Sequence, residues 1–396
     1  MLYVTYWGAT EALGQSLVLP SVVRLAQGGA RITLVTFDKR EDFASRDEFA
    51  RILGELERAG IRWIALRYHK RPQLPAKLYD VLRACVTGIA TQLRGSTAIV
   101  HARTFVGGLA GLVLAPLLRA KLIYHNEGFY PDEQVDGGVW AFGSRSHRIA
   151  RALEDRLYAR ADGIVALSER AKVAIEARPA VQQRRTPVIV VPSTVDLDRF
   201  QPRNGRSERH HSGLGLVYIG SIGLRYLFDR VAHFAAVAYR ETGDARLHVL
   251  SRADRSMIEA LLESSGLPRE SWHVSSVPHA EMPNALVQHD AGLFFLTQGL
   301  SEHGCSPTKI GEYWACGLPV VTTPNVSDTD EIVRRERVGV IVREHSAGGY
   351  REAVRELVEL LKDPEVGMRC RRAAESHYAL GPGCERQIAL YRKVLT

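Results

Sequence analysis

The sequence predicts an α/β protein of two domains, each built on a doubly wound parallel sheet. Short apolar segments alternate with longer segments of helical periodicity in both halves of the chain, which indicates βαβ units with parallel strands. A polar, turn-rich stretch, Pro192–Gly215, separates the two series and contains the charged run RSERHH. The chain has 396 residues, enough for two domains with substantial cores.

The first series extends from the beginning of the chain to residue 195. Its predicted strands are Leu2–Tyr6, Arg31–Phe37, Ile61–Leu66, Ala98–His101, Lys121–Tyr124, Gly163–Leu167 and Pro187–Val191. Its predicted helices are Leu13–Ala26, Arg46–Ala59, Lys77–Leu93, Thr104–Leu118, His147–Arg160 and Glu169–Ala177. The stretch Asn126–Phe142 contains three glycines and Pro131, and we expect it to be a loop.

The second series covers residues 212–381, after a linker at 196–211. Its predicted strands are Leu216–Gly220, Ala245–Leu250, Trp272–Val274, Gly292–Leu296, Leu318–Thr322 and Gly339–Val342. Its predicted helices are Leu227–Arg240, Ser256–Ser265, His279–His289, Thr308–Ala315, Asp328–Glu336, Gly349–Leu361 and Pro364–Tyr378, and a last helix follows at Cys384–Val394. Ligands of doubly wound sheets bind outside the carboxyl ends of the strands, so we expect the site in a cleft between the two domains.

Composition excludes several classes of protein. Hydrophobic residues make up 45% of the chain and charged residues 24%, as in a globular protein. The net charge of +8 suits anionic ligands, but no nucleic-acid motif accompanies it, so we expect no nucleic-acid partner. Five cysteines without a C-x-x-C pair argue for a reducing compartment and against structural zinc.

The ends of the chain and its most apolar run bear on localisation. The sequence begins directly with a strand, without a visible signal peptide, so we expect a cytoplasmic protein. The run Phe105–Leu118 is too short to span a membrane and contains Pro116, so we expect a buried helix. The basic helix His147–Arg160 could attach the protein to the inner membrane face, or it could simply be a solvated helix of mixed charge.

The segment Ser301–Asn325 carries the clearest chemistry. Ser306 is expected to cap a helix that has Pro307 at its first position, and Gly317 is expected to end it in a left-handed conformation. A helix start with Lys309 in its first turn can hold phosphate. Glu312 lies on the same helix face and can accept hydrogen bonds from two vicinal hydroxyls. The alternative is an ordinary capped helix that leads into a core strand.

Polar and glycine residues follow several other predicted strands. Gly8 follows the first strand, while His101 and Arg103 stand at the end of the fourth. Gly220, Ser221 and Arg225 form a turn whose flexibility and charge suit a diphosphate. The loop 126–142 combines carboxylates with aromatic residues, which suits a hydroxyl-rich ligand. Each of these could instead be an ordinary turn or a hydrogen-bonded strand end.

Two Asp-x-Asp pairs raise the question of a metal ion. Asp196 and Asp198 lie in the segment V-P-S-T-V-D-L-D-R-F, and Asp328 and Asp330 begin a predicted helix. Asp328 and Glu331 have the spacing of a capping box, which explains the second pair through helix initiation. We therefore predict no catalytic metal ion and no other cofactor.

The segment S-P-T-K-x-x-E-Y-x-A-C-G-x-P-V-V closely resembles the donor-binding segment of GT-B glycosyltransferases of family 4. This resemblance implies that the nucleotide diphosphate lies on the loop and helix start and that Glu312 binds the ribose. The family commonly has a second Glu eight residues before the ribose Glu. Here Gly304 occupies that position and Glu302 is the nearest carboxylate, which places the corresponding sugar contact in question. The implied residues of the loop and helix start are Gly304, Cys305, Ser306, Pro307, Thr308 and Lys309.

The resemblance extends over nearly the whole chain and implies further roles. Gly8, Gly220, Ser221 and Arg225 would complete the donor site, and the V-P-x-x-V-D-x-x-x-F segment matches a structural junction of this fold. Either His101 or Arg103 would lie by the transferred sugar. The last helix, residues 382–396, would cross back to the first domain. The residues implied on the acceptor side are Thr10, Gln15, His125, Glu127 and Glu133.

The resemblance implies a retaining glycosyltransferase that uses a nucleotide diphosphate sugar, with UDP and GDP both open. The expected catalytic residues are His101, Arg103, Arg225 and Lys309, and the acceptor is a small molecule, a lipid-linked molecule or a polysaccharide precursor. One alternative is a nucleotide-sugar epimerase or hydrolase of the same fold, which would need no acceptor. Another is a non-catalytic nucleotide-sugar binding protein, which Gly304 suggests.

Overall fold

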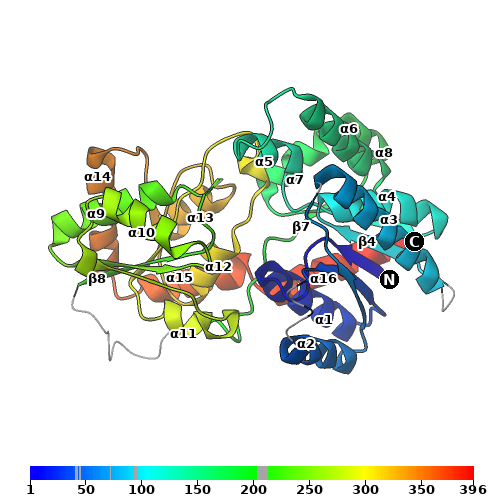
Figure 1. Ribbon diagram of the computed structural model, residues 1–396, viewed down its shortest axis with the longest axis horizontal. Helices are drawn as coiled ribbons and strands as arrows, with labels where there is room; N and C mark the ends of the chain where they lie inside the picture. Colours follow the sequence, from blue (N-terminus) through cyan, green and yellow to red (C-terminus); the bar gives the residue numbers. More distant parts are fainter. Residues whose placement is uncertain (41–42, 44–45, 72, 93–95, 203–212, 224) are drawn as a thin grey trace. The chain divides into compact units, whose positions relative to one another are not determined.

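The computed structural model describes residues 1–40, 43, 46–71, 73–92, 96–202, 213–223 and 225–396. These residues form two compact units (Figure 1). Unit 1 consists of Met1–Val135, Trp140–Thr194 and Leu380–Thr396, and unit 2 of Asp136–Val139 and Val195–Ala379. Most of the predicted linker falls on residues 203–212, which lie outside the described residues.

Unit 1 contains a sheet of seven strands in the order β3-β2-β1-β4-β5-β6-β7, and every neighbouring pair is parallel. The order reverses direction at β1, as in a doubly wound sheet, so the prediction of a parallel α/β domain is confirmed. The strands are β1 (Leu2–Thr5), β2 (Thr33–Asp38), β3 (Arg62–Arg67), β4 (Ile99–Arg103), β5 (Lys121–His125), β6 (Gly163–Ala166) and β7 (Val188–Val190).

Helices cover both faces of this sheet, and the buried cores show which helix lies on which face. Side chains of α1, α2 and α16 share one core, while those of α3, α4, α6 and α7 pack into two others. The last helix therefore packs on unit 1, as predicted. The helices are η1 (Gly14–Val18), α1 (Leu19–Gln27), α2 (Arg46–Arg58), α3 (Gln73–Gln92), α4 (Phe105–Leu117), α5 (Tyr130–Asp136), α6 (Arg145–Arg160), α7 (Glu169–Glu176), α8 (Pro179–Arg184) and α16 (Leu380–Leu395).

Unit 2 contains a sheet of six parallel strands in the order β10-β9-β8-β11-β12-β13. The strands are β8 (Leu214–Ile219), β9 (Ala245–Leu250), β10 (Trp272–Ser275), β11 (Ala291–Phe294), β12 (Val320–Thr322) and β13 (Gly339–Ile341). The helices are α9 (Phe228–Thr242), α10 (Arg255–Ser264), η3 (Arg269–Ser271), η4 (His279–Glu281), α11 (Met282–Leu286), η5 (Glu302–Gly304), α12 (Thr308–Ala315), α13 (Thr329–Glu336), α14 (Ala347–Lys362) and α15 (Val366–His377).

One expectation about local structure was wrong and two others need detail. The predicted loop 126–142 contains the helix α5, because Pro131 occupies the first turn, where a helix tolerates proline. The apolar helix α4 is not buried all round, because its outward residues Val113 and Leu117 are 44% and 60% exposed. The first helix begins as the π-helix η1, a form that often occurs at functional sites.

The starts of two helices in unit 2 also differ from the predictions. Pro307 is the residue that precedes α12, and no side chain caps that helix. The side chain of Asp328 makes no capping bond to α13, so the capping-box explanation was wrong. The carboxylate of Asp330 instead accepts a hydrogen bond from the backbone N–H of Asn325, at 2.9 Å. The prediction that Gly317 ends α12 in a left-handed conformation is confirmed by its φ of +78°.

No described helix combines the length and the apolar character that crossing a membrane requires.

Candidate functional site

Two buried aromatic residues fix α12 at the carboxyl edge of the sheet in unit 2. The hydroxyl of Tyr313 accepts a hydrogen bond from the N–H of Ile219 at 3.0 Å and donates to the carbonyl of Leu293 at 3.2 Å. The indole N–H of Trp314 donates to the carbonyl of Val338 at 2.9 Å. Tyr313 thus ties α12 to the ends of β8 and β11. The first-turn N–H groups, which a helix leaves without intrahelical partners, therefore belong to the edge where α/β proteins bind ligands.

The structure brings Lys309 of α12 against the turn that follows β8. Its ammonium lies 3.2 Å from the hydroxyl of Tyr226 and 4.4 Å from the centre of that ring. Gly220 has a φ of +126°, and a Cβ there would lie 2.2 Å from Cε of Lys309. Glycine at this position thus provides both the backbone conformation and the space that the lysine side chain needs.

The other turn residues predicted for the donor site lie close by in the chain. Ser221 is exposed, and its carbonyl accepts a hydrogen bond from the hydroxyl of Tyr218 at 2.6 Å. Arg225 is half-buried, and its carbonyl accepts a bond from the N–H of Thr297 at 2.8 Å. Together with Lys309, this turn forms a positively charged edge at the carboxyl end of β8.

Glu312 lies one turn further along α12, and a histidine lies beside its carboxylate. Nε2 of His279 is 3.5 Å from Oε1 of Glu312, while Nδ1 of His279 accepts a hydrogen bond from Arg199 at 3.1 Å. Because Nδ1 is an acceptor, the neutral ring carries its proton on Nε2, which faces the carboxylate. A carboxylate can accept several hydrogen bonds, so this contact leaves capacity for ligand hydroxyls. Sequence reasoning missed His279 and Arg199, because they are distant from Glu312 in the chain.

The loop before α12 is compact. Gly304 is buried at the end of η5, and the thiol of Cys305 lies 3.2 Å from the carbonyl of Glu302. Ser306 and Thr308 flank Pro307 at the helix start, and all three are half-buried. Ser306 does not cap α12, but lies beside the phenol of Tyr378. Among the predicted donor residues, the structure therefore groups those of the helix start with those of the turn after β8.

In unit 1, His101 and His125 form a buried pair on neighbouring strands. His101 is the register partner of Tyr3, whose ring stacks on it at 4.3 Å between centres. Nε2 of His101 lies 3.1 Å from Nδ1 of His125, and Nδ1 of His101 lies 2.7 Å from the hydroxyl of Tyr391 in α16. Burial lowers the pKa of both histidines well below the ordinary value, and the charge of Arg103 adds to this effect. Both rings are therefore neutral at pH 7.

Arg103 and Glu127 form a buried ion pair beside these histidines. Nε of Arg103 donates to Oε1 of Glu127 at 2.5 Å, and the same carboxylate oxygen lies 3.3 Å from Nε2 of His125. Arg103 also donates to the carbonyl of Leu17 in the π-helix η1, at 3.2 Å. Burial raises the pKa of Glu127, and the charge and hydrogen bond of Arg103 oppose that rise. The side chain of Arg103 is thus almost fully buried, at 3% exposed, whereas that of Glu127 is 10% exposed.

The first loop is organised around Asp38, which sequence reasoning did not assign to the site. The backbone N–H and the hydroxyl of Thr10 both lie 3.2 Å from Oδ1 of Asp38. A Cβ at Gly8 would lie 2.9 Å from the same oxygen, so glycine permits this close approach. Gln15 donates to the carbonyl of Thr10 at 3.0 Å. Asp38 is the last residue of β2. An acidic residue at the end of a predicted strand is the sequence feature that could have identified it as part of the site.

Glu133 lies elsewhere in unit 1, half-buried on α5. Its neighbour Asp132 joins α5 to α6 through Arg151 and through His147, whose Nε2 is 3.4 Å from the carboxylate. Of the five residues predicted on the acceptor side, the structure therefore places His125 and Glu127 together, Thr10 and Gln15 together, and Glu133 on a separate helix.

The described residues contain no group of three or more His, Cys, Asp or Glu side chains arranged to hold a metal ion.

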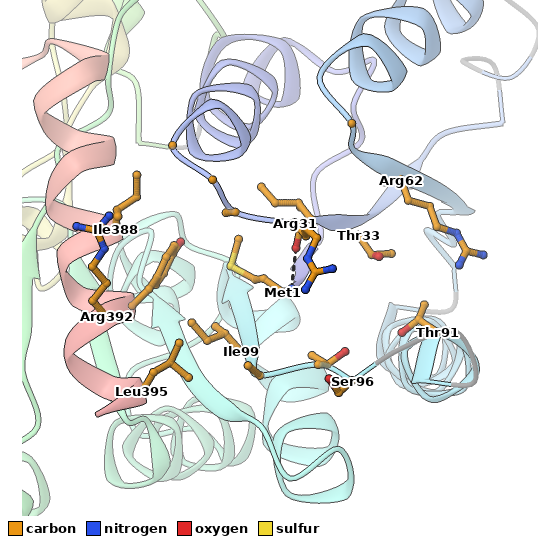
Figure 2. Close-up of a pocket in the computed structure, with 18 residues that line it drawn as sticks. Met1, Arg31, Thr33, Arg62, Thr91, Ser96, Ile99, Ile388, Arg392 and Leu395 are labelled. Atoms are coloured by element: carbon orange, nitrogen blue, oxygen red, sulfur yellow. Dashed lines mark hydrogen bonds between the residues drawn. The ribbon is translucent and has the colours of Figure 1, made fainter.

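A hollow of about 850 Å³ lies at the opposite, amino end of the strands in unit 1 (Figure 2). Its walls include Arg31 before β2, Thr33 and Arg62 at the starts of β2 and β3, and Arg392 of α16. Tyr391 also lines it, although the hydroxyl of this residue contacts His101. Because ligands of doubly wound sheets bind at the carboxyl ends of the strands, we do not place the candidate site in this hollow.

The two buried histidines predict that stability depends on pH. Their pKa values are lowered by folding, so below about pH 6.5 the unfolded chain takes up protons that the folded protein does not. Stability is therefore present above pH 6.5 and is lost as the pH falls, by at most about 1.4 kcal/mol per histidine at pH 5.5. Urea unfolding of the wild type and of the double variant His101→Gln/His125→Gln at pH 7.5 and 5.5 checks this. The prediction fails if the two proteins lose equal stability between these pH values.

Comparisons with known proteins agree with this architecture. The glycosyl transferase 4-like domain matches residues 18–194, and the domain of glycosyl transferases group 1 matches residues 214–360. A D-inositol 3-phosphate glycosyltransferase from Geodermatophilus obscurus is 27% identical in an alignment of 307 residues that covers 72% of this chain. The chain spans 60% of the length of that relative.

Two solved structures show the same fold at low sequence identity. Sucrose-phosphate synthase from Thermosynechococcus elongatus has a TM-score of 0.73 at 15% identity, over 99% of this chain and 98% of that one. The Anabaena protein Alr3699/HepE in complex with UDP and glucose has a TM-score of 0.67 at 13% identity, over 99% of both chains.

Proposed function

Because the chain belongs to the GT-B glycosyltransferases, with a glycosyl transferase 4-like domain followed by a group 1 domain, we propose that it transfers a sugar from a nucleotide diphosphate sugar to an acceptor, with retention of configuration. One observation carries the proposal: Lys309 contacts the glycine turn after β8, while Glu312 stands one helical turn away. This arrangement offers a place for a diphosphate and a place for a ribose on one helix.

In the proposed donor complex, the diphosphate lies at the start of α12. Lys309, Arg225 and the first-turn N–H groups neutralise the charge that develops on the leaving phosphate. The ribose hydroxyls bind Glu312, about 7–8 Å further along the helix axis than Pro307 at 1.5 Å per residue. Unit 2 thus binds the donor, and Thr10, Gln15, His125, Glu127 and Glu133 of unit 1 are the proposed acceptor-side residues.

The anomeric configuration of the sugar is retained if the acceptor attacks from the same face from which the leaving group departs. The departing phosphate then takes the proton of the acceptor hydroxyl, and no strong protein base is required. The low pKa values of His101 and His125 support this proposal, because a neutral histidine with a lowered pKa is a weak base. These histidines would position the transferred sugar or the acceptor through hydrogen bonds.

We also propose that transfer needs no metal ion and takes place in the cytoplasm. Cationic groups of the protein can neutralise the leaving diphosphate where other enzymes use a divalent ion. All five cysteines are free thiols, which suits a reducing compartment. Activity that survives treatment with EDTA would support the first statement, and loss of activity that magnesium restores would contradict it.

A panel of nucleoside diphosphates tests the donor site. Thermal unfolding is measured with UDP, GDP, ADP, TDP and CDP, and one nucleotide should raise the melting temperature through binding to the folded state. UDP comes first, since the Anabaena structure of the same fold is a complex with UDP and glucose. If no nucleotide stabilises the protein, with or without magnesium, the proposed donor site is wrong.

The variant Glu312→Gln assigns the bound nucleotide to α12. We expect its Kd for the nucleotide sugar to rise about 10–100-fold, because hydrogen bonds to a charged group contribute about 1.5–3 kcal/mol. Titration calorimetry with the nucleotide found in the panel measures this change. The matched control is Glu302→Gln, which removes the neighbouring carboxylate on η5. A larger effect of Glu302→Gln would assign to Glu302 the contact that we give to Glu312.

Product analysis separates sugar transfer from the two alternatives. The solved structure of a Listeria monocytogenes protein assigned as a UDP-N-acetylglucosamine 2-epimerase has a TM-score of 0.61 to this chain. The fold alone therefore does not distinguish sugar transfer from epimerisation. An epimerase or hydrolase would turn over the nucleotide sugar without an acceptor. A binding protein would show nucleotide affinity without turnover. Release of nucleotide that depends on an added acceptor is the result that sugar transfer requires.

A further inference from the structure

The helix α3 exposes an apolar stripe on the side that faces away from the sheet. Leu78, Leu82, Val86 and Ile89 follow one another at helical spacing, and each is between 45% and 60% exposed. The opposite side of α3 is also apolar, since Ala84 and Cys85 belong to the core beneath it. A helix with apolar residues on both sides usually packs against other molecules or elements on both sides.

Neighbouring helices of the same layer extend this stripe. The helix α4 packs between α3 and α6, as Figure 1 shows, and all three cover the same face of the sheet. On their outward sides, α4 exposes Val113 and Leu117, and α6 exposes Ile149. We call the outward surface of α3, α4 and α6 the helical face. Its apolar side chains thus come from three helices that pack side by side, which exceeds the single scattered residues of an ordinary surface.

The charges on the helical face are almost all positive. The one carboxylate of α3, Asp80, is buried and accepts hydrogen bonds from the hydroxyl of Tyr6 at 2.9 Å and the backbone N–H of His69 at 3.1 Å. The helix α4 has no charged residue, and Glu154 of α6 is buried. Asp155 is the exposed carboxylate of α6, and Arg178 binds it. The exposed cations on or next to these helices are Arg119, Arg145, Arg148, Arg156 and Arg160.

We propose that the helical face lies on the surface of a bilayer that contains anionic lipids. Apolar side chains on the outward side of the layer would enter the headgroup region, and the arginines would bind lipid phosphates. A second copy of this chain fits less well, because two helical faces packed together would bring arginines against arginines without carboxylates to pair them. The proposal extends the expectation for the basic helix α6 to a larger surface, most of which is contributed by α3 and α4.

Flotation of the full-length protein with vesicles tests this proposal. We expect binding to phosphatidylcholine vesicles that contain phosphatidylglycerol, much weaker binding to phosphatidylcholine alone, and a decrease as salt is raised. The double variant Leu82→Glu/Val86→Glu should lower the partition coefficient by more than about tenfold. Its matched control is Met257→Glu/Met368→Glu, two exposed apolar residues of unit 2, which should bind like the wild type.

A second pair of changes tests the charges independently. Arg148→Glu/Arg156→Glu should lower the partition coefficient on the order of tenfold, because it replaces two cations that face lipid phosphates with carboxylates. Circular dichroism melting confirms that each variant is folded. Unchanged binding of either double variant, or equal binding to neutral vesicles, overturns the proposal. A wild type that is dimeric by light scattering and becomes monomeric in Leu82→Glu/Val86→Glu would assign the helical face to a second copy instead. Vesicle binding requires no sugar transfer, so its outcome is independent of the proposed function.

Discussion

The variant Lys309→Ala is expected to lower kcat by about 10²–10³-fold while raising the Kd for the donor by less than about tenfold, because removal of one preorganised group that stabilises developing charge has an effect of that size. Lys309 is held beside the turn after β8 by Tyr226 and by the absence of a side chain at Gly220. The charge on the departing phosphate grows in the transition state, so the ammonium should matter more for turnover than for binding. Steady-state kinetics and nucleotide titration together give both quantities.

Two further variants show whether the position of the ammonium matters. Gly220→Ala would place a methyl group 2.2 Å from Cε of Lys309, so it should displace the lysine and lower kcat although the charge is retained. Lys362→Ala removes an exposed lysine at the end of α14 and should leave kcat unchanged. Equal losses of kcat and donor affinity in Lys309→Ala would indicate a role in binding alone. Wild-type activity in this variant would remove Lys309 from the mechanism.

The variant Arg103→Ala is expected to lower the free energy of unfolding by about 3–5 kcal/mol, because it leaves the carboxylate of Glu127 buried without its partner. Arg103 is 3% exposed and also donates to the carbonyl of Leu17, so water cannot easily replace its hydrogen bonds. Urea unfolding measures this loss at pH 7.5. The effect would place Arg103 among the residues that hold the site together, beside whatever role it has in catalysis.

A double-mutant cycle separates the ion pair from other effects of truncation. Arg103→Ala/Glu127→Ala should be less destabilised than the sum of the two single variants, since no charge is then left unpaired. The matched control is the exposed pair Arg51 and Glu55 on α2, for which a contribution of about 0.3–0.5 kcal/mol is expected. Additive effects at Arg103 and Glu127 would contradict the buried ion pair.

The alternation of strands and helices could be predicted because each strand is a short apolar run with turn residues on either side. The predicted strand Ala98–His101 corresponds to β4, which extends two residues further, to Arg103. The helix α5 was missed because Pro131 and the surrounding glycines are also typical of loops. Proline in the first turn is compatible with a helix, so the local pattern did not separate the two structures.

Residues of the candidate site were predictable where their role depends on local sequence. Lys309 and Glu312 are three residues apart on one helix, so their common face follows from helical periodicity. Asp38, His279 and Tyr391 were missed as partners of the site, because each contacts residues far away in the chain. Proline, glycine and charge patterns contain no information about such long-range pairs.

The sequence alone therefore determined the doubly wound α/β architecture and the helix that joins Lys309 to Glu312, since both follow from periodicities of two to four residues. Only the tertiary structure decided that Lys309 packs against Gly220, that His279 lies beside Glu312 and that Tyr391 of the last helix contacts His101. It also decided that α4, the most apolar helix, is open to solvent on one side. The reason is that burial and contact depend on which elements pack together, and parallel sheets bring together strands and helices that are distant in sequence.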